Sequence, residues 1–339
     1  MNDKEQKSMP EDPYHLERLA VAKTTARGMG GAAKIARQHE LGRLTARERI
    51  DLLLDKDTFE ELGLLAHSER VEDKDSTPAD GEITGFGEID GRAVYVGADD
   101  TTVKAGSYGL IGQKKEHDGQ DYAIKKGFPM INLGDASGGR IPDIMGAPGM
   151  MNVVLPIDKP PRDRFVPYIA TIMGDCFGGP TFYAAIADIV IQVKGTVMAV
   201  TGPAVLAAAT GEQVEPQALG GWELHARTTG QVDLFADDDA HCLQLVRKAL
   251  SYLPTNANHL PPRVCVDDSP TRRLDDIYRL LPASPRQGYD MRRVVKTIVD
   301  EDSVLELKPL YDRSLMTALA RLDGEVVGVL ANNPMFSAG

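Results

Sequence analysis

The sequence predicts an α/β fold, because buried-strand patterns alternate with glycine-rich turns and helical patterns from residue 125 onward. Residues 129–133 and 168–173 are short apolar runs typical of buried strands, and a turn rich in glycine follows each of them. The chain has 339 residues, of which 42% are hydrophobic, so it can bury a large core in one big domain or two ordinary ones.

The sequence of the N-terminal third predicts a surface arm, then a helix, then a hairpin. Residues 1–40 are charged and polar, which is typical of an arm. A helix is predicted over 45–54, where a Thr and a Glu three residues later match a capping box and apolar residues recur at helical spacing. Residues 81–87 and 92–97 predict two strands joined at Asp90-Gly91, a dipeptide typical of hairpin turns.

Further strands and helices are predicted after the second glycine-rich turn. Pro180 fits the first turn of a helix over 182–187, and strands are predicted over 189–193 and 197–200. A loop containing several prolines, residues 156–167, separates the two glycine-rich turns.

A polar, proline-rich stretch over 254–285 predicts a linker between domains. We place the boundary near Val266. The expected organisation is an N-terminal arm (1–40), a first domain (41–265), and a linker with an incomplete second domain (266–339).

An internal repeat lies on either side of this boundary. Residues 55–62 reappear as 300–307, each following an apolar helix, and residues 89–96 reappear as 322–329. The chain ends before the second copy reaches residues equivalent to the glycine-rich turns. We therefore expect the second domain to be unfinished in this chain.

Composition argues against several classes of protein. A formal net charge of −12 disfavours nucleic acid as the main partner. The charged N-terminus is unlike a secretory signal, and no apolar stretch of about 20 residues is found, so we expect a cytoplasmic protein without a membrane span. Three widely spaced cysteines predict neither a disulfide framework nor a zinc site, and no metal site is expected.

The strongest candidates for chemistry are the two glycine-rich turns, residues 134–140 and 174–179. Glycines after a buried strand allow a tight turn and leave backbone N–H groups free at the start of a helix. Such donors can stabilise a carbonyl oxygen as it gains negative charge, forming an oxyanion hole. A glycine pair alone is weak evidence, because this composition produces about three such pairs by chance.

Other candidate residues have a structural interpretation that is favoured over a catalytic one. His225 and His241 have no neighbouring Ser, Cys and Asp pattern of a catalytic triad. Cys176 beside the second turn is more typical of a small buried cysteine than of a nucleophile. Residues 85–90 begin like a dinucleotide-binding fingerprint, but the third glycine is absent and a strand follows.

Taken together, the motifs resemble those of the carboxyltransferase (beta) subunits of biotin-dependent acyl-CoA carboxylases, the group that includes propionyl-CoA carboxylase. The resemblance covers nearly the whole chain, and its specificity comes from the number of motifs in the same order. The matching segments are 42–50, 81–87, 106–109, 135–141, 178–179, 201–203, 210–212, 219–221 with His225, 250–254, 289–292 and 331–334.

This resemblance implies a crotonase-like fold, in which each half is a spiral of ββα units. It also implies transfer of a carboxyl group from carboxybiotin on a carrier protein to the α-carbon of an acyl-CoA thioester, giving a malonyl-CoA-type product. Biotin then takes the α-proton, and the protein stabilises the enolate with backbone N–H groups. The implied partners are a biotin carboxylase or biotin carrier subunit and further copies of the chain, arranged as a hexamer in the family.

The site residues are carried over from the family by position, and the first turn departs from the family pattern. The family has Asp-Ser-Gly-Gly-Ala-Arg where this chain has Asp-Ala-Ser-Gly-Gly-Arg over 135–140. We therefore assign the oxyanion role to Ser137 and Gly138, with Gly139 as the alternative if the turn is shifted by one residue. Gly178 and Gly179 are expected to bind the acyl-CoA.

The segments 142–145 and Pro160-Pro161 also differ from the family, so the acyl group stays open. Two alternatives to a carboxylating enzyme remain. One is a biotin-dependent acyl-CoA decarboxylase subunit, which runs the transfer backwards. The other is a non-catalytic CoA-binding or assembly subunit that needs a partner chain.

Overall fold

The computed structural model describes residues 13–144, 164–269, 271–284 and 286–336. Within these residues the strands of the central sheet are β1 (Glu60–Leu62), β2 (Glu82–Ile89), β3 (Arg92–Asp99), β4 (Met130–Gly134), β5 (Tyr168–Ile172), β7 (Ile189–Val193) and β9 (Leu234–Ala236), in that spatial order. β1, β2 and β3 pair antiparallel, and every pair from β3 to β9 is parallel. The predicted α/β architecture is confirmed.

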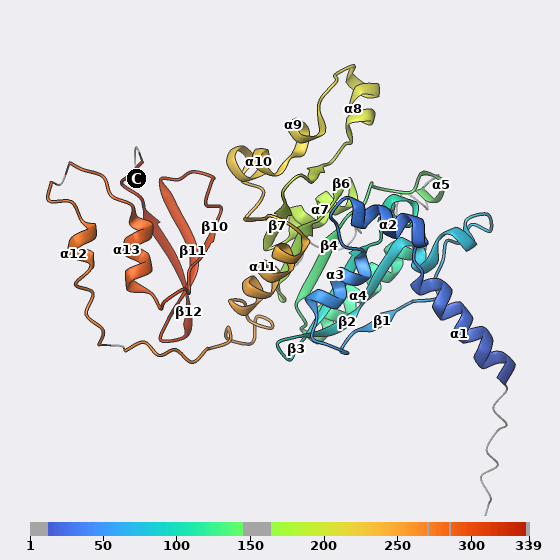
Figure 1. Ribbon diagram of the computed structural model, residues 1–339, viewed down its shortest axis with the longest axis horizontal. Helices are drawn as coiled ribbons and strands as arrows, with labels where there is room; N and C mark the ends of the chain where they lie inside the picture. Colours follow the sequence, from blue (N-terminus) through green and yellow to red (C-terminus); the bar gives the residue numbers. More distant parts are fainter. Residues whose placement is uncertain (1–12, 145–163, 270, 285, 337–339) are drawn as a thin grey trace, which may run out of the picture.

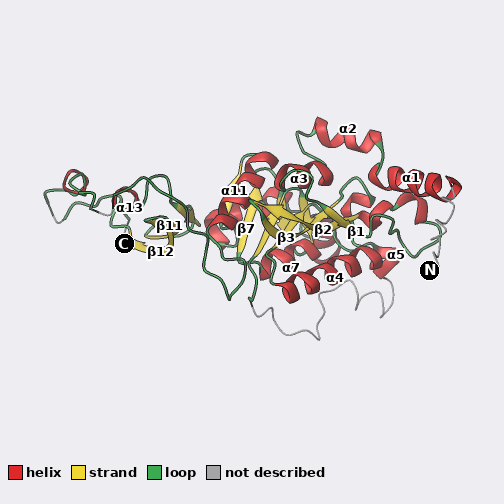
Figure 2. Cartoon of the chain, turned by 90° about the horizontal axis from the view of Figure 1, so that it is seen from below, coloured by secondary structure: helices red, strands yellow, loops and turns green. Residues whose placement is uncertain are grey.

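The helices that cover this sheet are α3 (Ala46–Leu53), α4 (Leu110–Lys126), α7 (Gly179–Ile186) and α11 (Asp239–Ser251). α3 and α11 pack together on one face, and α4 and α7 lie on the other (Figure 2). Because successive side chains of a strand point to opposite faces, Met130 and Ile131 of β4 enter separate cores. Ile131 packs in the core under α3 and α11, and Met130 packs in a tyrosine-rich core that includes Tyr95, Tyr108 and Tyr183.

Two local predictions are confirmed in detail. Thr45 caps α3: its side chain accepts a hydrogen bond from the N–H of Glu48, whose carboxylate accepts from the N–H of Thr45 at 2.8 Å. The β2–β3 hairpin turns at Asp90 and Gly91, with φ of 52° and 72°. A two-residue hairpin turn of type I′ requires positive φ at both central residues, as observed here.

The second glycine-rich turn contains a strand that the sequence pattern did not predict. β6 (Asp175–Phe177) pairs in parallel with β8 (Val197–Ala199), forming a small second sheet. The predicted helix over 182–187 begins earlier, at Gly179, because its proline fits the first helical turn and extends it toward the glycines. The expected loop over 156–167 and the Pro160-Pro161 pair lie largely outside the described residues.

A three-stranded antiparallel sheet forms the C-terminal part, at the opposite end of the molecule from α1 (Figure 1). It consists of β10 (Leu305–Leu307), β11 (Leu315–Leu322) and β12 (Glu325–Asn332), preceded by α12 (Ile277–Leu280) and α13 (Met291–Ile298). Lys308 links this part to the first through two contacts with Asp233. Its backbone N–H donates to the carbonyl of Asp233 at 2.8 Å, and its Nζ forms an ion pair with the Asp233 carboxylate at 2.8 Å.

The sequence repeat has a structural counterpart, since α3, β1 and the β2–β3 hairpin correspond to α13, β10 and the β11–β12 hairpin. Corresponding hydrogen bonds stabilise both copies. The carboxylate of Asp55 accepts from the N–H of Gly91 at 2.9 Å, and that of Asp300 accepts from the N–H of Gly324 at 2.8 Å. Each carboxylate thus fixes the hairpin turn against the segment that precedes the first strand.

Equivalent ion pairs also link the helix to the first strand in each copy. Arg47 of α3 pairs with Glu61 of β1 at 2.8 Å, and Arg292 of α13 pairs with Glu306 of β10 at 2.6 Å. Members of the two pairs are 245 residues apart, the same separation as Asp55 and Asp300. The repeat therefore extends to side-chain contacts.

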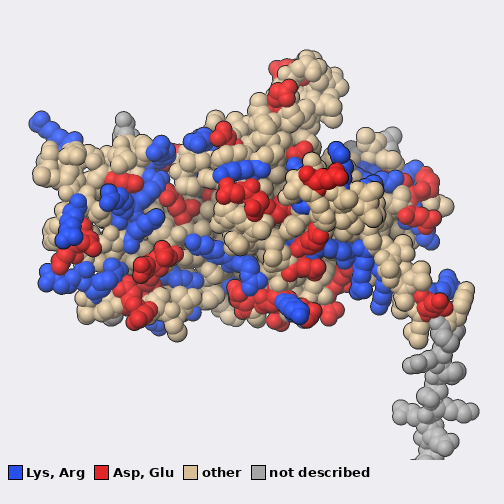
Figure 3. Space-filling model, in the orientation of Figure 1, with Lys and Arg blue, Asp and Glu red and all other residues tan. Residues whose placement is uncertain are grey.

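The remaining helices lie at the periphery: α1 (Pro13–Arg27), α2 (Ala32–Glu40), α5 (Ile141–Ile144), α8 (Pro203–Thr210), α9 (Pro216–Gly220) and α10 (Trp222–Leu224). α8 to α10 project from the body, and basic and acidic side chains are interspersed over the face seen in Figure 3. In the described part of the chain, no helix has the length and apolar character needed to cross a membrane.

Candidate functional site

Two adjacent parallel strands place the glycine-rich turns side by side. β4 ends at Gly134 and β5 at Ile172, and these two residues are partners in the sheet register. We call residues 134–140 the first glycine turn and residues 174–179 the second. The turns touch, because the N–H of Phe177 donates to the carbonyl of Ala136 at 3.1 Å. A Cβ added at Gly178 would lie 3.7 Å from the Cα of Gly138.

Some backbone N–H groups of these turns are used within the fold and others are not. The N–H of Ser137 donates to the carbonyl of Ala105 at 3.1 Å, and that of Gly178 donates to Val200 at 3.1 Å. No acceptor among the described residues receives the N–H of Gly138, Gly139 or Gly179. Gly179 is the first residue of α7, where an N–H group has no partner inside the helix.

Tyr108 contacts both turns. Its N–H donates to the carbonyl of Gly138 at 2.9 Å, and its carbonyl accepts from the N–H of Arg140 at 2.8 Å. Its ring packs against Gly179, where an added Cβ would lie 2.1 Å from the ring. Only glycine fits there while Tyr108 keeps this position. At Gly138 the backbone itself favours glycine, since φ is 101°.

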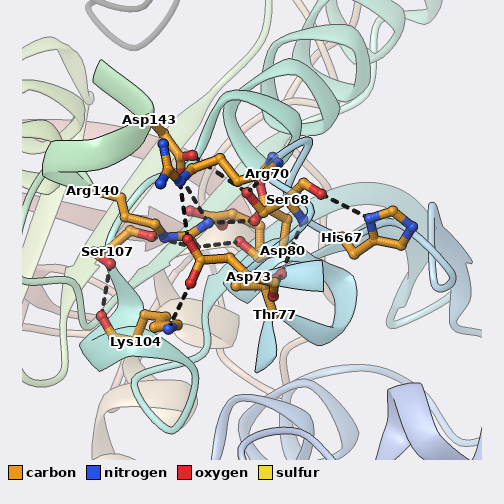
Figure 4. Close-up of polar contacts among 12 residues, drawn as sticks. His67, Ser68, Arg70, Asp73, Thr77, Asp80, Lys104, Ser107, Arg140 and Asp143 are labelled. Carbon is orange, nitrogen blue, oxygen red and sulfur yellow. Dashed lines mark hydrogen bonds and ion pairs between the residues drawn. The ribbon is translucent and has the colours of Figure 1, made fainter. Parts of the chain in front are cut away.

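Arg140 anchors the end of the first glycine turn (Figure 4). Its buried guanidinium lies 2.6 Å from the carboxylate of Asp80 and 2.9 Å from that of Asp143, and it donates to the carbonyl of Ser107 at 2.9 Å. Charge-assisted hydrogen bonds of this kind hold a loop in one geometry. Both terminal nitrogens of Arg140 thus hold the turn, while its buried Nε has no partner among the described residues.

A cavity of about 360 Å³ opens beside the first glycine turn. Lys104 on its rim binds the carboxylate of Asp73 at 2.9 Å, and this hydrogen bond lowers the pKa of Asp73. The cavity is lined by Asp73, Lys104, Ser107, Ser137, Gly139, Arg140, Ile141 and Pro142. Ser137 and Gly139, both predicted as site residues, thus face the same space.

Arg49 supports the first glycine turn from below. Its side chain is completely buried and lies 2.9 Å from Asp135 and 2.8 Å from Asp239. Burial disfavours its charge, but the two carboxylates raise its pKa overall. The sequence carries one signal for this role, because Arg49 falls on the stripe of α3 that also holds the buried residues Ala46, Ile50 and Leu53.

A group of buried carboxyl side chains near the first glycine turn was also missed. Glu82 and Asp99 are opposite each other in the β2–β3 register, and both are buried. Burial raises the pKa of Glu82 well above its usual value and that of Asp99 to about 7. On α4, burial raises the pKa of Glu116 to about 6 and lowers that of Lys115 to about 8. No local sequence pattern marks these residues as neighbours.

Cys176 and His225, for which the sequence favours a structural role over a catalytic one, are both engaged in the fold. Burial raises the pKa of the Cys176 thiol well above its usual value, which disfavours the reactive thiolate. His225 uses both ring nitrogens, with Nε2 2.8 Å from the carbonyl of Met198 and Nδ1 3.0 Å from the hydroxyl of Thr229. Within the described ranges, no three His, Cys, Asp or Glu side chains are grouped as metal ligands would be.

Comparison with known families identifies this architecture. The carboxyl transferase domain matches residues 37–339. The chain belongs to the carboxyl transferase domain family. Its relatives include the methylmalonyl-CoA decarboxylase subunit alpha of Veillonella parvula, which is 35% identical over 95% of this chain. The propionyl-CoA carboxylase carboxyltransferase subunit of Haloferax mediterranei is 37% identical over 96% of the chain.

Solved structures agree with this assignment. A crystal structure of transcarboxylase 12S, described as a hexamer with methylmalonyl-coenzyme A and methylmalonic acid bound, has a TM-score of 0.87 and 32% identity over 97% of this chain. The expected crotonase-like carboxyltransferase fold is thereby confirmed. This carboxyl transferase chain spans 63% of the length of the two relatives named above and 64% of the transcarboxylase chain.

Proposed function

We propose that this chain carries an acyl-CoA site of a biotin-dependent carboxyl transfer reaction. A carboxyl group would move between biotin on a carrier protein and the α-carbon of an acyl-CoA thioester held at the two glycine turns. The observation that carries the proposal is the set of backbone donors at the meeting point of the turns, Gly138, Gly139 and Gly179. Family membership and the named relatives support it.

These residues fit a thioester, because the glycine turns offer donors without side chains in the way. Loss of the α-proton places negative charge on the thioester oxygen, and preorganised N–H groups stabilise that charge. Since the N–H of Ser137 donates to Ala105, we propose Gly138 and Gly139 as the donors of the first glycine turn. Ser137 would instead contact the acyl-CoA through its side chain, which lines the adjoining cavity. Gly178 and Gly179 complete the proposed binding surface.

Biotin on a carrier protein would supply the carboxyl group and the base. The contribution of this chain is then to bind the thioester, orient it and stabilise its oxygen. Tyr108 serves this by contacting both turns, and Arg140 by anchoring the end of the first. The proposed partners are a biotin carboxylase or biotin carrier subunit and further copies of this chain, by analogy with the hexameric transcarboxylase 12S.

The direction of transfer has a second candidate. The relative from Veillonella parvula is named a methylmalonyl-CoA decarboxylase subunit, whereas the relative from Haloferax mediterranei is named a carboxylase subunit. Both directions pass through the same charged thioester oxygen. The backbone donors are thus compatible with carboxylation of an acyl-CoA and with its reversal.

Calorimetric titration with propionyl-CoA and methylmalonyl-CoA tests binding, and carboxyl transfer from methylmalonyl-CoA to free biotin tests chemistry. NADH serves as a ligand that should not bind. Gly138→Ala keeps the N–H, but its side chain disfavours the φ of 101° and its Cβ would lie 3.2 Å from the carbonyl oxygen of Phe177, so the donor should be displaced. We expect transfer by this variant to fall about 100-fold to 1,000-fold, the usual effect when one oxyanion donor is lost. Its control is Gly195→Ala, since Gly195 also has positive φ, 83°, but an added Cβ there meets nothing within 4 Å.

The outcomes separate the alternatives. Binding with transfer that Gly138→Ala abolishes supports the proposed reaction. Binding without transfer supports a CoA-binding subunit that needs a partner chain. Failure of both acyl-CoA compounds to bind the folded protein contradicts the proposed site.

A further inference from the structure

The buried carboxyl pair Glu82 and Asp99 lies directly beneath the first glycine turn. The two residues face each other across the antiparallel β2–β3 ladder, and their exposed fractions are 2% and 1%. One oxygen of each, Glu82 Oε1 and Asp99 Oδ1, has no donor partner in the described part of the chain. Two ionised carboxylates so placed would repel each other, whereas a carboxyl group that shares one proton with a carboxylate satisfies both oxygens.

The neighbouring groups favour the shared proton. Lys115, whose positive charge acts on Glu82, directs its Nζ to the backbone carbonyls of Ala79 and Glu82, at 2.9 and 2.6 Å. Its charge therefore only partly compensates a second negative charge on the pair. The other titratable side chains that face the pair bring negative charge or none: Tyr95 on β3, Tyr108 before α4, Glu116 on α4, Asp135 after β4, Cys176 on β6 and Tyr183 on α7.

The pair is connected to both glycine turns. Asp99 Oδ2 accepts the backbone N–H of Asp135 at 2.8 Å, at the start of the first glycine turn. The same oxygen lies 3.4 Å from the hydroxyl of Tyr108. Tyr108 in turn binds the carbonyl of Gly138 and packs against Gly179. The carboxylate of Asp99 thus binds the first glycine turn directly and is linked to the second through Tyr108.

The second copy of the repeat shows that the hairpin itself does not need this pair. The register position of Glu82 and Asp99 is occupied there by Leu315 opposite Asn332, 233 residues further on. That hairpin forms with neither carboxyl group. In the first copy, the strand paired next to β3 is β4, which leads into the first glycine turn.

We propose that Glu82 donates a proton to Asp99, and that this shared carboxyl pair is a positioning element that sets the donors of Gly138 and Gly139. Neither residue touches the substrate; both act through Asp135 and Tyr108. The inference rests on the proposed function only for its effect on catalysis. The protonation of Glu82 and the placement of the turn are measurable without any substrate.

Infrared spectroscopy tests the shared proton. At pH 8, the folded wild-type protein should show the carbonyl stretch of a buried protonated carboxyl group, with its shift in D₂O. Glu82→Gln should abolish this band, and Asp99→Asn should shift it. The matched control is Glu61→Gln, because both oxygens of Glu61 already accept hydrogen bonds from Arg47 and its replacement should leave the band unchanged. Absence of the band in the wild type, or its persistence in Glu82→Gln, overturns the proposal.

Two substitutions at Glu82 test positioning. Gln keeps a hydrogen-bond donor toward Asp99, whereas Leu, the residue at the equivalent position of the second copy, does not. In ¹⁵N-glycine-labelled protein, Glu82→Leu should move the amide signals of Gly138 and Gly139, and Glu82→Gln should largely restore them. Carboxyl transfer should fall about 100-fold in kcat with little change in KM for Glu82→Leu, as for a misplaced catalytic group, with rescue by Gln.

The possible failures are distinguishable. If Gly138→Ala and Glu82→Leu both leave acyl-CoA binding and transfer unchanged, the proposed function is wrong, and the amide signals still decide the positioning role. If Gly138→Ala abolishes transfer but the Gln and Leu variants of Glu82 behave alike, the positioning role is wrong. Circular dichroism of each variant confirms that a loss does not reflect unfolding.

Discussion

The two copies of the repeat share a local design but differ in how deeply they are buried. Thr45 and Asp290 cap the equivalent helices α3 and α13 with their side chains. Yet Leu53 of α3 is 0% exposed, whereas Ile298, at the same repeat position of α13, is 42% exposed. α11 covers α3, and it has no equivalent packed on α13 in the described part of the chain. The local sequence of each copy specifies the same unit of a helix, a strand and a hairpin, which we call the module. How deeply the module is buried depends on the elements packed around it.

The site depends on the same difference. β3 lies between β2 and β4, and β4 leads into the first glycine turn. β12, the equivalent of β3, is the edge strand of its sheet within the described residues, and its Leu330 is 77% exposed. At the equivalent position of β3 stands Gly97, which is covered by the Glu116 carboxylate. The repeated module is thus a scaffold, and the two glycine turns lie in the elements that follow the first copy along the chain.

The largest expected effect concerns the ion cluster found only in the first copy. Arg49→Ala leaves Asp135 and Asp239 buried without their cation, so we expect the free energy of unfolding to fall by about 3–5 kcal/mol. Arg292→Ala, which removes a more exposed arginine from the second copy, should cost less than about 1 kcal/mol. Urea unfolding followed by the fluorescence of the single Trp222 measures both. Similar losses for both variants would contradict the comparison.

Features that depend on neighbouring residues were predictable from the sequence. The capping box of Thr45 and Glu48 and the turn at Asp90-Gly91 each involve residues a few positions apart, and both form as predicted. The glycine turns were also recognised locally. Their role as site residues stays a prediction, and the structure refines it by showing that the N–H of Ser137 is already used.

Features that depend on distant residues were not predictable in this way. The partners of Arg49 are 86 and 190 residues away, so a pattern within α3 could mark the arginine but not its function. β6 has only three residues and exists because β8 pairs with it. Glu82 looks like an ordinary polar residue at the start of a strand, and only the register opposite Asp99 makes it notable.

The next effect tests burial directly at one repeat position. Leu53→Ala should lower the free energy of unfolding by about 2–5 kcal/mol, because it removes a fully buried side chain from the core under α11. Ile298→Ala should change it by about 0.5 kcal/mol or less, because Ile298 is substantially exposed. Chemical unfolding of the two variants in parallel compares their losses in the free energy of unfolding. Equal effects would mean that α13 is covered in solution.

A smaller effect arises from the buried carboxyl group that the second copy lacks. The pKa of Asp99 is raised by burial from 3.8 to about 7, so between these values the folded state binds more protons than the unfolded state. Stability from this group therefore falls as pH rises toward 7, by at most about 1.4 kcal/mol per pH unit. Asp99→Asn should remove that slope. Measuring the free energy of unfolding of the wild type and of Asp99→Asn at pH 5, 6, 7 and 8 checks this prediction. Parallel plots of that free energy against pH for the two proteins would refute it.

The smallest effect compares the equivalent ion pairs Arg47–Glu61 and Arg292–Glu306. Double-mutant cycles should give coupling energies of about 0.2–1 kcal/mol for both, as is usual for partly exposed pairs. The first should be the larger, because Arg47 binds both oxygens of Glu61, at 2.8 and 2.9 Å, whereas Arg292 binds one oxygen of Glu306. A larger coupling for Arg292 would show that local geometry, and not only the surrounding elements, has diverged between the copies.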